Sequence, residues 1–82
     1  METSIQITCF AGLRKFFDPQ VNIQLQLPAS YQSLIHELKK MNPEATEILD
    51  HCRIAVNEKF VPHTELKTTG EPVYLIPPSS GG

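Results

Sequence analysis

Two stretches near the start of the chain alternate apolar with polar side chains, the period of a half-buried β-strand. In the first stretch, Ile5, Ile7 and Cys9 are the apolar positions. The second, residues 21–27, reads VNIQLQL and has one wholly polar side, which favours a sheet with one face open to water. Residues 11–17 predict a short helical turn between them, so the two strands form an opening hairpin.

The apolar spacing then changes to that of a helix. A stripe of apolar residues recurs at i, i+3, i+4, i+7 and i+10, and its members are Tyr31, Leu34, Ile35, Leu38 and Met41. This stripe predicts an amphipathic helix over residues 30–41 with one buried side. Ser30 is a suitable N-cap, and the Asn42-Pro43 pair ends the helix. Residues 44–50 are compatible with another helical turn.

The second half of the chain predicts short strands joined by turns. Residues 53–57 and 60–61 read as two strands around a tight turn. Residues 73–76, with the sequence VYLI, form the last strand. Pro77-Pro78 ends that strand, because proline lacks the N–H that strand pairing needs.

These elements predict one α+β domain, a mixed sheet with one main helix packed on one face. The domain occupies residues 1–78, and residues 79–82 form a flexible C-terminal arm. A chain of 82 residues is consistent with a single core.

Composition and charge argue against several classes of function. The formal net charge is −2 and the basic residues are scattered, which argues against nucleic acid as the primary partner. The sequence has neither a long apolar run nor the pattern of a signal peptide, so we expect a cytoplasmic protein without a membrane partner. In a reducing compartment Cys9 and Cys52 are expected to be thiols, with Cys9 a buried packing residue.

The sequence contains few of the residue patterns that form common catalytic or metal sites. His36, His51 and His63 have no metal-ligand spacing with one another or with the cysteines, so we expect solvated surface histidines and no metal site. The sequence also contains neither a glycine-rich phosphate loop nor a serine nucleophile elbow.

The most unusual feature is the ending, PPSSGG. Two prolines stiffen the exit from the last strand, and the four residues that follow them can extend by roughly 13 Å. Gly81 and Gly82 lack a Cβ and would fit a tunnel too narrow for other residues. The alternative interpretation is a frayed or linker-like terminus, since SSGG is also typical of flexible linkers.

Three segments resemble the sulfur carriers that include the small subunit of molybdopterin synthase and the thiamin-pathway carrier. They are FAGLR at residues 10–14, VNEK at residues 56–59 and, most specifically, VYLIPPSSGG at residues 73–82. The resemblance covers nearly the whole chain and implies a ubiquitin-like β-grasp fold. FVP at residues 60–62, followed by Glu65-Leu66, is also similar to the thiamin carrier. The resemblance therefore identifies the carrier chemistry more specifically than it identifies the pathway.

The resemblance also implies the chemistry. The Gly82 carboxylate would be adenylated by a ubiquitin-activating-like enzyme that consumes ATP, and a persulfide donor would convert it into a thiocarboxylate. This sulfur would be delivered to a cyclic pyranopterin in the large subunit of molybdopterin synthase. On this interpretation the chain is not an enzyme on its own and holds no permanent cofactor, and catalysis lies in the large subunit.

Partner contacts are expected on the open face of the sheet and along the exit. Tyr74 and Ile76 alternate with the presumed core positions Val73 and Leu75, and aromatic and aliphatic anchors suit an interface core. Arg14 matches the family's arginine in the opening motif. The predicted partner-binding residues are Phe10, Arg14, Phe60, Tyr74, Ile76, Pro77, Pro78, Ser79 and Ser80.

Three alternative functions remain open at this point. The carrier chemistry can serve thiamin synthesis or tRNA thiolation in place of the molybdenum cofactor. The chain can be a ubiquitin-like modifier that forms isopeptide bonds through Gly82. It can also be an interaction module with an inert tail.

Overall fold

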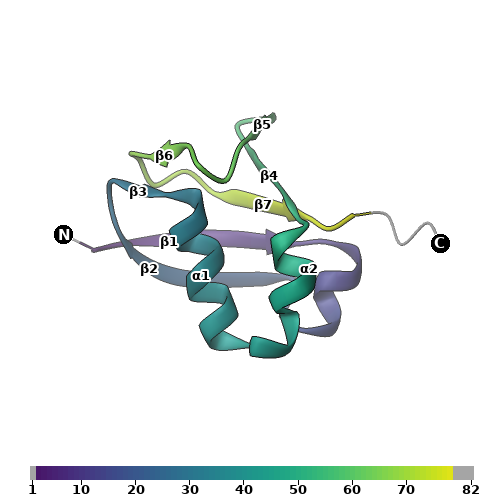
Figure 1. The fold of residues 1–82 in the computed structure, drawn as a ribbon. Coiled ribbons are helices and arrows are strands. Elements are labelled where there is room, and N and C mark those ends of the chain that lie inside the picture. The colour runs from purple at the N-terminus through teal and green to yellow at the C-terminus, as the bar shows by residue number, and fades with distance from the viewer. Residues whose placement is uncertain (1, 79–82) are drawn as a thin grey trace.

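The protein folds as a main sheet with its helices on one side (Figure 1). The structure, a computed structural model, describes residues 2–78. The main sheet has five strands, in the order β2-β1-β7-β4-β5. They are β1 (Glu2–Cys9), β2 (Gln20–Gln26), β4 (Arg53–Val56), β5 (Lys59–Val61) and β7 (Val73–Ile76). A separate two-stranded sheet pairs β3 (Ala29–Ser30) with β6 (Leu66–Lys67), which the sequence did not predict.

Four helical segments complete the domain. They are the 3-10 helix η1 (Ala11–Lys15), the α-helix α1 (Tyr31–Met41), the 3-10 helix η2 (Pro43–Ala45) and the α-helix α2 (Thr46–Asp50). The predicted helical turns after the first strand and after the main helix are therefore confirmed. No helix within residues 2–78 is long and apolar enough to cross a membrane.

The strand that comes last in the sequence lies at the centre of the sheet. β7 pairs in parallel with β1, and Ile7 lies opposite Val73. On its other side β7 pairs antiparallel with β4, while β1 and β2 form the predicted antiparallel hairpin. The sheet is mixed, as expected, and the end of β7 is positioned by strands on both sides.

The core lies between the sheet and the helices. Alternate residues of β1 and β7 are fully buried, so both strands have one core side and one outer side. Tyr31, Leu34, Ile35 and Leu38 of α1 pack against them as predicted. Met41 does not, because its side chain is 54% exposed. Met41 is the last residue of α1 and lies three residues beyond Leu38, the last buried position of the helix.

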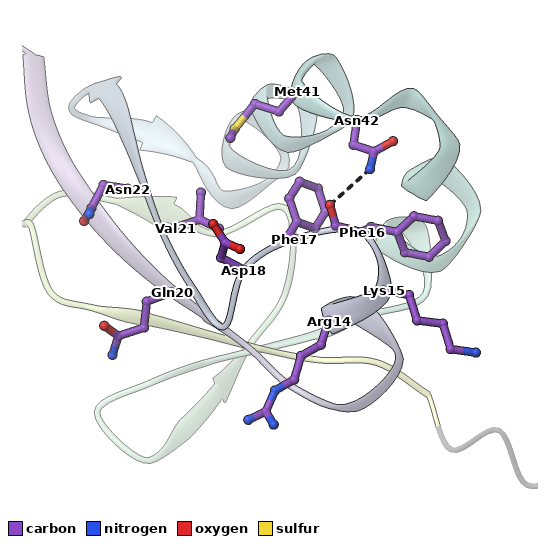
Figure 2. A pocket seen from close by; sticks show the side chains of 10 residues that line it. All are labelled: Arg14, Lys15, Phe16, Phe17, Asp18, Gln20, Val21, Asn22, Met41 and Asn42. Carbon is purple, nitrogen blue, oxygen red and sulfur yellow. Dashed lines mark hydrogen bonds between the residues drawn. The ribbon is translucent and has the colours of Figure 1, made fainter.

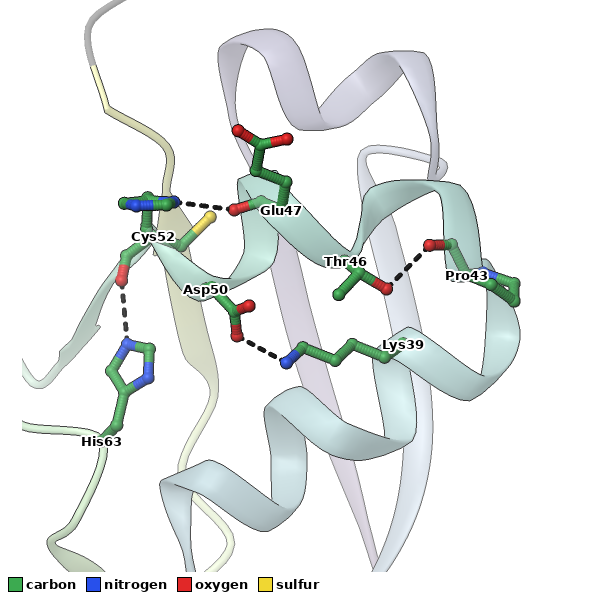
Figure 3. Close-up of polar contacts among 8 residues, drawn as sticks. Lys39, Pro43, Thr46, Glu47, Asp50, Cys52 and His63 are labelled. Atoms are coloured by element: carbon green, nitrogen blue, oxygen red, sulfur yellow. Dashed lines mark hydrogen bonds and ion pairs between the residues drawn. The ribbon is translucent and has the colours of Figure 1, made fainter.

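Local hydrogen bonds explain where the helices begin and end. The Ser30 hydroxyl oxygen accepts a hydrogen bond from the backbone N–H of Ser33 at 3.3 Å, as expected of an N-cap. The side chain of Asn42 accepts from the N–H of Glu44 and so caps η2. An ion pair between Lys39 and Asp50 links α1 to α2 (Figure 3). These contacts hold α2 beside the end of β7.

The tight turn between β4 and β5 has two residues, Asn57 and Glu58, with φ of 52° and 66°. Two successive positive φ values are typical of type I′ hairpin turns, whose twist matches that of the strands. The turn predicted from the sequence is therefore confirmed, and β4 ends one residue earlier than expected, at Val56.

Lys67 of β6 is buried, which the sequence analysis did not foresee. Its Nζ donates to the backbone carbonyl of Glu71 at 2.9 Å, lies 3.6 Å from the Glu71 carboxylate and stands 5.6 Å from the centre of the Tyr31 ring. Burial lowers the pKa of Lys67, and the nearby Glu71 charge opposes that shift. The lysine therefore joins β6, the N-terminal turn of α1 and the loop before β7.

Replacing Lys67 by Ala should lower the free energy of unfolding by about 2 kcal/mol, because it leaves the Glu71 carbonyl unsatisfied and removes apolar stem contacts. Lys67→Met keeps the stem and should cost less than Lys67→Ala. Urea unfolding of both variants measures the difference, with exposed Lys59→Ala as the control. Equal stability of Lys67→Ala and the unchanged protein would refute this role.

Candidate functional site

The candidate site is the end of β7, where the chain leaves the sheet. Pro77 is buried and Pro78 is exposed. Pro77 is buried and therefore offers a partner little free surface, and its role as a partner contact stays a prediction. The predicted residues Ser79, Ser80, Gly81 and Gly82 lie outside the described residues.

The outer side of β7 is exposed, as the sequence predicted. Tyr74 is 40% exposed and Ile76 is half-buried, whereas Val73 and Leu75 are fully buried. The Phe10 and Tyr74 rings lie side by side, with centroids 6.2 Å apart and an interplanar angle of 32°. The structure therefore brings together three of the predicted partner-binding residues.

Phe60 extends the same surface toward the edge of the sheet. Residues Tyr74 and Phe60 both lie opposite Ala55, one on each side of β4. Because Ala55 is small, the two rings flank a low point in the surface. Phe60 is 61% exposed, and together with Phe10 and Tyr74 it forms a group of exposed aromatic side chains on one face.

Arg53 was missed by the sequence analysis. Its guanidinium carbon lies 5.5 Å from the centre of the Phe60 ring, a cation–π contact, and it lies opposite Ile76 across the strands. The apolar Ile54 in the same short strand could have indicated this, because the residues on either side of a buried strand position face outward. We call the surface formed by Phe10, Arg53, Ala55, Phe60, Tyr74 and Ile76 the docking face.

Arg14 lies beside the docking face and has a local role. Its Nε donates to the carbonyl of Cys9 at 3.2 Å, and the backbone N–H of Phe10 donates to the carbonyl of Leu75 at 3.3 Å. These bonds hold η1 against the ends of β1 and β7. Figure 2 shows Arg14 and Lys15 extending away from Met41, on the margin of a shallow surface hollow.

The two cysteines are buried packing residues, which confirms the expectation for Cys9. Burial raises the pKa of Cys9, and burial together with the nearby Cys9 raises the pKa of Cys52 to about 11. Both thiols are therefore protonated at neutral pH, whereas a nucleophilic or sulfur-accepting cysteine needs its thiolate form. The folded domain does not offer either thiol for sulfur chemistry.

The histidines are structural or solvated. His36 and His51 are exposed, as predicted, although His51 also contacts the carbonyl of Glu47 through Nδ1 at 2.9 Å. His63 departs from the prediction: it is half-buried, and its Nε2 lies 2.9 Å from the carbonyl of Cys52 (Figure 3). Within residues 2–78, no three His, Cys, Asp or Glu side chains are grouped closely enough to hold a metal ion.

Solved structures with the same fold cover almost the whole chain. SAMP1 from Haloferax volcanii has a TM-score of 0.80 and 21% identity, over 98% of this chain and 100% of that one. A protein from Pyrococcus furiosus described as molybdopterin converting factor subunit 1 has a TM-score of 0.78 and 27% identity, over 93% and 98%. The complex of subunits 1 and 2 of the molybdopterin-converting factor from Helicobacter pylori has a TM-score of 0.58 and 18% identity, over 98% and 100%.

Ubiquitin-like domains also match, among them a Caldiarchaeum subterraneum ubiquitin with a TM-score of 0.67 and 16% identity, over 100% of both chains. These likenesses confirm the expected β-grasp fold. No curated protein matches the sequence significantly. The family model described as the ThiS family matches residues 7–82. The chain therefore belongs to the ThiS family and is a ubiquitin-like sulfur carrier.

Proposed function

We propose that this carrier serves molybdenum cofactor biosynthesis as the small, sulfur-donating subunit of a molybdopterin synthase. The observation that carries the proposal is that one central strand, β7, both forms the middle of the docking face and leads through Pro77 into the C-terminal glycines. The 27% identity to the Pyrococcus furiosus protein described as molybdopterin converting factor subunit 1 supports it.

The reacting group in this proposal is the carboxylate of Gly82. A carboxylate is a poor electrophile, because its charge is delocalised and its leaving group would be oxide. Adenylation by an activating enzyme converts it into a mixed anhydride with AMP and releases pyrophosphate from ATP. A persulfide sulfur then attacks the carbonyl carbon and AMP leaves. A second thiol then attacks the donor's sulfur in the resulting acyl disulfide, forms a new disulfide with the donor and is thereby oxidised, and the thiocarboxylate of Gly82 leaves.

The domain's contribution is positioning. Strand pairing on both sides of β7 fixes the direction in which the chain leaves the sheet. The four residues after Pro78 can reach at most roughly 13 Å, so the reacting group stays within a short distance of the docking face. A partner that binds the docking face thereby receives the terminus at high effective concentration.

The proposed partners follow from this chemistry. A large subunit would hold the cyclic pyranopterin and supply the catalytic groups, and an adenylating enzyme and a persulfide donor would load the sulfur. The Helicobacter pylori structure is a complex of subunits 1 and 2 of a molybdopterin-converting factor, which supports a partner of the large-subunit kind. ATP is used by the activating enzyme, so this chain needs no cofactor of its own.

A turnover comparison tests the pathway. The thiocarboxylated chain should convert the pyranopterin substrate of the large subunit from the same organism, and should do so faster than it supports thiazole synthesis with that organism's thiazole-forming enzyme. The carboxylate form of the chain is the matched control in both assays. Faster sulfur delivery to the thiazole would instead assign the chain to the thiamin pathway.

A further inference from the structure

A groove of about 930 Å³ lies on the other side of the chain's exit from the docking face. It runs between η1 and the segment formed by η2 and α2, which lie together beside the end of β7 in Figure 1. Its apolar lining comes from Ala11, Phe16, Ile48 and the two prolines of the exit. The root of the arm therefore has an apolar surface on each side.

Gly12 keeps this groove open. A Cβ added to Gly12 would lie 3.4 Å from Cδ1 of Ile48, so any larger side chain at this position would extend between η1 and α2. Gly12 does not have a positive φ, so its backbone conformation does not require glycine. A side chain at this position would occupy the space beside Ile48.

The charged and titratable side chains that line the groove are Glu44, Glu47, Lys15 and His51, so the two carboxylates outnumber the one lysine. Glu44 and Glu47 lie on the side of η2 and α2, and both are exposed. Neither forms an ion pair with another residue in the described range 2–78. In Figure 3 the Glu47 carboxylate extends from α2 toward η1. Lys15 is the cation on the facing side.

We infer that this groove is a second docking site, which holds an apolar side chain of the synthase large subunit flanked by a lysine or arginine. The inference rests on the proposed function. The apolar lining suits an aliphatic or aromatic anchor, and the two glutamates suit a neighbouring cation. A partner that receives the arm must surround its root, so it reaches both the docking face and the wall formed by Pro77 and Pro78.

The chain's own last residues fit the groove less well. Ser79-Ser80-Gly81-Gly82 supply no apolar side chain for the apolar lining. Their terminal carboxylate would also be repelled by Glu44 and Glu47. Both the lining and the charge of the rim therefore favour a partner's side chain.

Binding of the intact chain to the molybdopterin synthase large subunit of the same organism tests the inference, using isothermal titration calorimetry. Gly12→Leu places a side chain in the groove beside Ile48 and should raise the dissociation constant about tenfold or more, whereas Gly12→Ala should change it less than threefold. The double variant Glu44→Lys/Glu47→Lys should weaken binding about fivefold or more, with a smaller loss at high salt. The control Glu2→Lys/Glu65→Lys makes the same charge change at exposed positions outside the groove lining.

The outcomes separate the inference from the proposed function. If the unchanged chain binds neither the large subunit nor the adenylating enzyme, the proposed function fails and the inference fails with it. If the unchanged chain binds but Gly12→Leu, with an unchanged melting temperature, binds equally well, only the groove is refuted. If the free chain forms a dimer and Gly12→Leu does not, the groove binds a second copy of the chain. That result would also overturn the inference.

Discussion

Removal of Gly82 is expected to abolish sulfur transfer completely while leaving the domain folded. In the proposed mechanism the carboxylate of Gly82 is the only group that is adenylated. A chain that ends at Gly81 would present its carboxylate one residue, about 3.3 Å, short of the reacting position. The buried core is formed by residues up to Pro77, so the free energy of unfolding should change by less than about 0.5 kcal/mol. Intact mass after incubation with the activating enzyme, ATP and a sulfur source measures the gain of sulfur.

Two further variants identify the cause of that loss. Gly82→Ala keeps the length and the carboxylate but adds a Cβ, and it should react slowly if the partner's passage admits only glycine. Ser80→Ala, which leaves both glycines in place, should be loaded at a rate within a few-fold of the unchanged chain. Normal sulfur loading of the chain without Gly82 would contradict the proposed chemistry.

Tyr74→Glu is expected to weaken binding to the large subunit about a hundredfold. The Tyr74 ring lies at the centre of the docking face, beside Phe10 and across Ala55 from Phe60. A buried carboxylate in an aromatic interface core loses its hydration without gaining a partner, and central aromatic residues carry much of the binding energy of interfaces. Surface plasmon resonance with the immobilised large subunit measures the change.

The stability of the same variant distinguishes docking from packing. Tyr74 faces away from the buried Val73 and Leu75, so Tyr74→Glu should lower the free energy of unfolding by less than about 1 kcal/mol. Gln24→Glu, an exposed position on β2, is the matched control and should change neither quantity. An unfolded Tyr74→Glu variant would show that this side of β7 is part of the core.

The sequence predicted those elements whose pattern is local. The alternation in β1, β2 and β7 placed their core sides correctly, because a strand with one exposed face needs polar residues at every second position. The helix boundary at Ser30 followed from a side chain that caps its own helix. Met41 was assigned to the core wrongly, because it ends α1 and lies beyond Leu38, the last buried position of the helix.

Features that depend on distant contacts were not predictable in the same way. Burial of Lys67 depends on a carbonyl of Glu71 and on the ring of Tyr31, and no pattern in residues 66–67 indicates either contact. The position of Arg53 over Phe60 requires the register between β4 and β5. The groove beside Gly12 exists only because η1 and α2 meet, although they lie more than thirty residues apart in the chain.

The central position of β7 has a consequence for how the protein is made. All other described strands precede β7 in the sequence, yet β7 separates β1 from β4. During synthesis the ribosome therefore releases two partial sheets, β1 with β2 and β4 with β5, that cannot join until the last strand emerges. Pairing Ile7 with Val73 closes a loop of 66 residues, and such non-local contacts slow folding.

In the proposed function, the same topology would couple folding to recognition by the activating enzyme. Tyr74 and Ile76 reach their places beside Phe10 and Arg53 only when β7 is paired on both sides. A nascent or misfolded chain carries the same terminal glycines but lacks an assembled docking face. An enzyme that binds both the docking face and the terminal glycines would therefore adenylate folded carriers and leave unfolded chains unmodified.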